Sequence, residues 1–216
     1  MTRKFSAILL FCLTSAVSGA QSTAPRPRST PLPGNYSVEL DNAYVRVTRA
    51  SFTPRETVPV HLHPTYPTVY VYLTDGGRMR FIHITPSYTV ERAPVRAGGI
   101  RYNRNWHDET HVIEYLGDEP TEYLRVEMKT VPDHEHADAR MAPEDATPIE
   151  DAQVLISRHE CGAGAACSLP SRPALVVSID ERDFIWAEPG LTEPQRNSRS
   201  RPLHQIWIEL KTPPVK

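Results

Sequence analysis

Apolar and polar residues alternate along many short segments of this chain, with the period of two that is typical of β-strands. The clearest case is Thr68–Thr74, whose sequence TVYVYLT is rich in the valine and tyrosine that strands favour. The same pattern predicts strands over 44–49, 78–84, 100–103, 111–115, 123–129 and 174–179. No segment has a convincing helical period beyond a turn or two. Many short strands of this kind predict an all-β sandwich or barrel.

Turn residues separate the predicted strands. Asp75-Gly76-Gly77 predicts a hairpin turn that joins 68–74 to a returning strand over 78–84. Further turns are expected at 97–99 and at 117–120. The chain also has 21 prolines, and this favours short strands and turns over long helices because proline breaks a helix interior.

The first residues have the order of a secretory signal peptide: a short basic start, the apolar stretch Phe5–Val17 and small residues up to Ala20. The apolar stretch is too short to span a bilayer comfortably. We therefore expect 1–20 to be a removed signal peptide and 21–34 to be a proline-rich tether. The alternative, a buried N-terminal helix, is disfavoured because the tether has four prolines. The expected location is periplasmic or secreted, with no membrane partner after cleavage.

Charge argues against one class of partner. The full chain has a formal net charge of −2, and loss of 1–20 removes two basic and no acidic residues, which leaves −4. A mildly acidic chain without a long basic tract is not expected to bind nucleic acid.

Two cysteines remain after the predicted cleavage, Cys161 and Cys167. A paired count in an oxidising compartment predicts a disulfide, and the small residues between the two cysteines allow a short loop to close. Two free thiols, or a metal or redox site, are the alternatives.

The end of the chain resembles its middle. Residues 133–151 are polar and are expected to be a linker, after which 201–211 matches 119–129 with proline, glutamate and lysine in the same places. Arg49 and Arg158 align at an offset of 109 positions, and the ends of the two copies align at an offset of 82. We therefore expect 152–216 to be a shortened repeat of the first half. Chance similarity between two strands is the alternative.

Three histidines are the strongest candidates for chemistry. His61 and His63 are two residues apart, so on a strand both imidazoles point to the same face. His111 begins another predicted strand and can complete a set of three nitrogen ligands. Imidazole suits Zn, Cu, Fe and Ni, and three ligands with open positions suit catalysis. The alternative is that the histidines are satisfied polar residues of a barrel without metal. His83 and His107 are weaker candidates for ligands.

These motifs resemble the cupin family. The first cupin motif is Gly, five residues, His-x-His, three or four residues, Glu, six residues, Gly. Arg55 stands at the first glycine, His61 and His63 at the histidines, Thr68 in place of the glutamate, and Gly76 one position late.

The second cupin motif resembles 98–115. His111 stands at the family histidine and Tyr115 where asparagine is usual, and the spacing from Gly98 to His111 is two residues longer than in the family. The resemblance implies a cupin-type antiparallel β-barrel (a double-stranded β-helix or jelly roll) over 35–132, followed by a shortened, degenerate cupin-like β half.

Without the motif glutamate, the set resembles that of the three-histidine cupins, such as the Fe(II)-holding thiol dioxygenases. The resemblance implies a divalent transition metal (Fe, Mn or Zn) held by His61, His63 and His111, a small-molecule ligand or substrate, and a dioxygenase-like oxidation. The alternative is a non-catalytic module that binds a small ligand or a partner without metal. A homodimer is a further expectation, since cupins are frequently dimers.

Other residues could line such a barrel. Tyr70, Tyr72, Arg101 and Tyr102 lie on predicted strands and could orient a substrate. Alternation requires about half of them to face outward.

Overall fold

The structure is a computed structural model that describes residues 33–63, 66–104, 108–133, 136–188, 190 and 196–215. The predicted signal peptide and most of the predicted tether lie outside these residues. The described part contains strands and no α-helix, so the all-β prediction is confirmed. No helix in these ranges could therefore cross a membrane.

The strands that build the first half come first in the chain. They are β1 (Tyr36–Asp41), β2 (Val45–Phe52), β3 (Thr57–His63), β4 (Thr68–Tyr72), β5 (Met79–His83), β6 (Tyr88–Arg92), β7 (Ile100–Asn103), β8 (Glu109–Tyr115), β9 (Thr121–Met128) and β10 (Ala139–Met141). The remaining strands form the second half: β11 (Ile149–Glu150), β12 (Val154–Cys161), β13 (Ala174–Ser178), β14 (Asp183–Ala187) and β15 (Leu203–Leu210).

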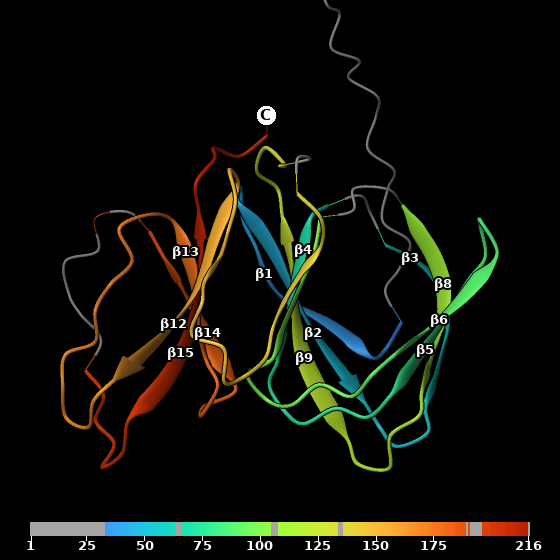
Figure 1. Cartoon of the computed structure of the whole chain (residues 1–216), viewed down its shortest axis with the longest axis horizontal. Helices are drawn as coiled ribbons and strands as arrows, with labels where there is room; N and C mark the ends of the chain where they lie inside the picture. Colours follow the sequence, from blue (N-terminus) through green and yellow to red (C-terminus); the bar gives the residue numbers. More distant parts are fainter. Residues whose placement is uncertain are drawn as a thin grey trace, which may run out of the picture.

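Three antiparallel sheets lie in layers (Figure 1). The six-stranded sheet, in the order β1-β2-β9-β4-β7-β10, lies in the middle. The four-stranded sheet, β3-β8-β5-β6, covers one of its faces and closes the barrel. The five-stranded sheet, β11-β12-β15-β13-β14, covers the other face.

Alternation gives the six-stranded sheet two different faces. Residues such as Val69 and Val126 face the second half and join one apolar core with Ile156, Leu175 and Ile208. Each fully buried side chain of this size contributes about 1.5–3 kcal/mol relative to an exposed one. The opposite face points into the barrel, where aromatic and polar side chains gather.

The five-stranded sheet has the same strand order and register as β1, β2, β9, β4 and β7. Arg49 pairs with Leu124 in the first half, and Arg158 pairs with Ile206 in the second. Arg158 comes 109 positions after Arg49, and Ile206 comes 82 positions after Leu124. The turns also correspond. Asn42 Oδ1 accepts the backbone N–H of Val45 at 2.9 Å, and the equivalent oxygen of Asp151 accepts that of Val154 at 2.9 Å.

The predicted hairpin at 75–77 is wrong. β4 pairs with β7 and β9, whereas β5 pairs with β6 and β8. Both edges of β4 are therefore occupied, and residues 75–77 lead the chain from one sheet to the other.

The segment 133–151, expected to be a linker, contains two short strands. β10 pairs with β7, and β11 pairs with β12. These strands form because the edge of each sheet offers free backbone hydrogen-bonding groups, which the polar composition of the segment does not reveal. Arg104 Nε also contacts Asp151 Oδ2 at 2.8 Å, with both side chains buried, so the barrel and the second half share an internal ion pair.

The predicted disulfide is present between Cys161 and Cys167, whose Cα atoms are 5.1 Å apart. Cys161 ends β12 and packs with Cys167 and Leu203. The disulfide closes a short loop at the point where, in the first half, the chain leaves β2 for the four-stranded sheet.

Replacing both cysteines, as Cys161→Ala with Cys167→Ala, should lower the free energy of unfolding by about 2 kcal/mol, because the chain-entropy model assigns this value to so short a loop. Urea unfolding of the oxidised protein and of the double variant measures the difference. Equal midpoints and slopes would contradict the prediction, as would two thiols that react with a labelling reagent in the unfolded, non-reduced protein.

Candidate metal centre

Three neighbouring strands of the four-stranded sheet bring four histidines together inside the barrel. β3 holds His61 and His63 on one face because they are two residues apart. β8 places His111 directly opposite His61, and β5 places His83 opposite His111. All four histidines are buried.

The three histidines that the sequence singled out converge. One ligand nitrogen from each of His61, His63 and His111 lies within 4.8 Å of the others. The Nε2 atoms of His61 and His63 are 2.9 Å apart. His61 Nδ1 is 2.8 Å from the carbonyl oxygen of Pro59. A carbonyl only accepts hydrogen bonds, so Nδ1 has the proton and Nε2 of neutral His61 presents a lone pair.

The imidazoles are held neutral. Burial, with His61 and His83 close by, lowers the pKa of His111 to about 2. Burial, with Arg125 and His111 nearby, places the pKa of His63 well below its usual range. Neutral imidazole is the form that binds metal ions.

Several of these nitrogens have no hydrogen-bond partner among the described residues. They are His63 Nδ1 and both ring nitrogens of His111. A buried polar atom without a partner costs about 1–3 kcal/mol. A cation that accepts lone pairs from the ring nitrogens would remove part of this cost, so the donor set fits a divalent transition metal.

A carboxylate lies next to the three histidines. Glu109 Oε2 is 3.7 Å from His111 Nδ1, and ligand atoms of His83, Glu109 and His111 all lie within 4.8 Å of one another. Glu109 is two residues before His111 on β8 and directly opposite His63 on β3. A carboxylate at this nitrogen would orient the His111 ring and favour Nε2 as the ligand atom.

The sequence matches no family model and no curated protein. Solved structures resemble the fold at low sequence identity. Ylba from E. coli has a TM-score of 0.55 with 8% identity, covering 90% of each chain. AerE from Microcystis aeruginosa has a TM-score of 0.50 with 14% identity, covering 86% of this chain and 97% of AerE. A cupin domain from Bordetella pertussis is 21% identical over 49% of this chain and 98% of that domain, with a TM-score of 0.37.

The chain has a cupin fold. The backbone explains two positions of the cupin motifs. Gly98 has a φ of 79°, and Arg55, which stands where the first motif has glycine, has a φ of 61°. Both lie in the left-handed region, which favours glycine and costs another residue about 1–2 kcal/mol.

Thr68 stands where the first cupin motif has glutamate. Its Oγ1 donates to the backbone oxygen of Tyr66 at 2.8 Å, so the hydroxyl is already engaged. The carboxylate near the histidines comes instead from Glu109, which the sequence analysis did not select. The sequence could have indicated Glu109, because it is two residues before His111 and therefore lies on the same face of the strand.

The other candidates divide between the two faces of the six-stranded sheet. Tyr70, Tyr72 and Arg101 are on the barrel side. Tyr102 is on the opposite face, within the apolar core that the two halves share. His107 lies outside the described residues.

The free energy of unfolding of the metal-free protein should fall as the pH is lowered below about 6.5. The unfolded chain takes up protons on its histidines there, whereas folded His111, with a pKa of about 2, stays neutral. One such histidine lowers the free energy of unfolding by up to about 1.4 kcal/mol for each pH unit below this value. Urea unfolding at about pH 4–7 measures this slope.

His111→Gln removes one histidine that stays neutral in the folded protein. The free energy of unfolding of this variant should therefore depend less steeply on pH. His136→Gln is the matched control because His136 is exposed. If the free energy of unfolding depends equally steeply on pH in His111→Gln and in the unmodified protein, folded His111 does not stay neutral and the prediction is wrong.

Proposed function

We propose that this cupin binds one divalent transition metal ion (Fe, Mn or Zn) through His61, His63 and His111. The observation that supports this most directly is the 2.9 Å approach of two buried Nε2 atoms, one of which presents a lone pair. Ligand nitrogens that share a metal ion lie roughly 3 Å apart, since each metal–nitrogen bond is about 2.0–2.2 Å long.

Glu109 and Tyr36 contact the histidines and could interact with a small ligand bound there. The Glu109 carboxylate lies 3.7 Å from His111 Nδ1, and its negative charge favours the His111 tautomer that leaves Nε2 for a metal ion. Tyr36 packs on the set, with its ring centroid 5.4 Å from that of His61. Burial raises the pKa of Tyr36, so its hydroxyl keeps its proton and can donate a hydrogen bond to a ligand.

We propose dioxygen-dependent oxidation of a small organic molecule as the reaction. A divalent metal bound by three neutral imidazoles would keep its full charge and act as a Lewis acid. Fe or Mn would also supply the redox-active centre that oxidation by dioxygen requires, whereas Zn would not. Phe81 and Ile113, which are buried beside the histidines on β5 and β8, make part of the surrounding wall apolar. The rival function is a module that binds a small ligand without metal, and metal content distinguishes the two.

His61→Ala should abolish metal retention, because it removes one of the three ligand nitrogens. His111→Ala should do the same. Metal content per chain is measured by mass spectrometry after growth with Fe, Mn and Zn supplied. His136→Ala is the control, because His136 is exposed and lies in 133–151. This variant should have the same metal content as the unmodified protein.

Equal metal content in the unmodified protein and His61→Ala would refute the proposed ligands. An unmodified protein with no metal would favour the rival function.

We also propose that the protein is exported to the periplasm or secreted. The Cys161–Cys167 disulfide supports this, because disulfides persist in oxidising compartments. The order of basic, apolar and small residues in 1–20 supports it independently.

Export should remove 1–20, because Ser18 and Ala20 stand three residues and one residue before the proposed cut. The intact mass of the exported protein measures this, and a chain that begins at Gln21 is expected. An exported protein that retains Met1–Ala20 would refute the cleavage site.

A further inference from the structure

A row of arginines crosses the barrel face of the six-stranded sheet. Tyr70 on β4 is directly opposite Arg125 on β9 and Arg101 on β7. Arg101 is in turn opposite Arg140 on β10. Residues that face each other on adjacent strands have their Cβ atoms about 4.5–5.5 Å apart, and like charges in this arrangement destabilise a sheet. A negative charge bound between Arg101 and Arg140 would therefore stabilise this part of the sheet.

A fourth arginine reaches the row from the facing sheet. The Cζ atom of Arg92 on β6 is 4.0 Å from the ring centroid of Phe81 and 5.9 Å from that of Tyr70. Phe81 in turn packs on His111, with ring centroids 5.3 Å apart. Arg92 thus connects the arginine row with the three histidines.

These side chains line a partly open cavity of about 60 Å³. Its wall contains Arg92, Arg101 and Arg140, together with Tyr70, Asn103 and Asp138. A volume of this size holds about two water molecules, at roughly 30 Å³ each, or one carboxylate group. We call it the arginine cavity.

The positive charge of the arginine cavity is poorly balanced within the described residues. Arg101 is only 8% exposed, its Nε has no hydrogen-bond partner there, and one Nη2 bond to the backbone oxygen of Ala93 is 3.1 Å long. Burial, together with the nearby Arg92 and Arg140, lowers the pKa of Arg101. Asp138 is the one carboxylate of the described wall, and its Oδ1 accepts the backbone N–H of Arg104.

We propose that the arginine cavity binds the carboxylate of a small organic acid that is the ligand of the three-histidine site. Guanidinium groups bind carboxylates through paired, charge-assisted hydrogen bonds, which a buried Nε without a partner is ready to donate. Tyr70, which lines the cavity, then offers its ring to the rest of the molecule, and Phe81 lies between Arg92 and His111. This inference rests on the proposed function, since it names the substrate class of the same site.

Calorimetric titration of the metal-free protein tests this inference. The probes are benzoate, its uncharged analogue benzyl alcohol and inorganic phosphate. Benzoate should bind, benzyl alcohol should not, and phosphate should bind more weakly than benzoate. Arg101→Gln should weaken benzoate binding at least tenfold, because hydrogen bonds to charged groups are worth about 1.5–3 kcal/mol.

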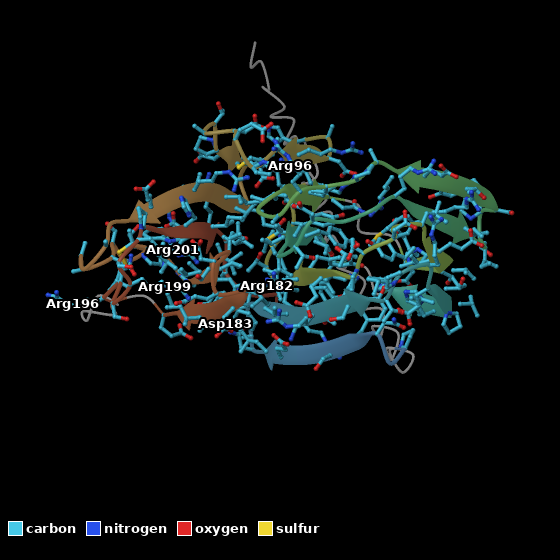
Figure 2. All side chains as sticks on the ribbon, turned by 90° about the horizontal axis from the view of Figure 1, so that it is seen from below. Arg96, Arg182, Asp183, Arg196, Arg199 and Arg201 are labelled. Carbon is cyan, nitrogen blue, oxygen red and sulfur yellow. A yellow bond between two sulfur atoms is a disulfide. The ribbon has the colours of Figure 1, made fainter. Side chains whose placement is uncertain are left out.

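Arg140→Gln provides a second variant that should fold normally, because Arg140 is exposed, and it should also weaken benzoate binding. Arg201→Gln is the matched control. Arg201 lies on the five-stranded half, at the other end of the molecule from the four-stranded sheet (Figure 2), and its side chain is 64% exposed. Its substitution should leave benzoate affinity unchanged.

Metal content is measured on the same samples, so the two proposals can fail separately. Benzoate binding that depends on Arg101 and Arg140 supports the arginine cavity even if the protein holds no metal. A protein that holds metal but does not bind benzoate overturns the inference and leaves the metal site intact. Binding of phosphate without benzoate, or equal benzoate affinity in both arginine variants and the unmodified protein, also overturns it.

Discussion

The six-stranded sheet is buried on both faces, and the period of two along its strands gives each face a different chemistry. Valines such as Val69 and Val126 pack against the second half, while Tyr70 and Arg125 turn into the barrel. A polar interior is costly to form, because each buried charge needs a partner. The apolar core on the other face stabilises the sheet that holds these polar groups in place.

The strands and the histidine set could be predicted from the sequence because both depend on local spacing. His61 and His63 share a face wherever they lie on a strand, and alternation over 68–74 already identifies β4. Relations between distant segments could not be predicted in this way. Glu109 lies next to the histidines because β8 pairs with β3 in one particular register, and spacing along the chain does not determine which strands pair.

Other elements had only weak local signals. In β6, apolar Tyr88 and Val90 alternate with polar residues over just five positions, and the strand is almost wholly exposed. β10 lies in a polar segment and forms by pairing with the edge of β7. The same limit applies to Arg101 and Tyr102. Their neighbouring positions show that one must face the barrel, but only the pairing with Tyr70 shows that it is Arg101.

The second half repeats the order and register of β1, β2, β9, β4 and β7, which supports the interpretation of 152–216 as a shortened copy. Its five-stranded sheet covers the apolar face of the six-stranded sheet with residues of the same chain. An apolar face of this kind can otherwise be covered by another subunit, and such a protein dissociates on dilution. Here the covering layer is tethered covalently, so its local concentration is fixed and the barrel keeps this layer however dilute the protein becomes.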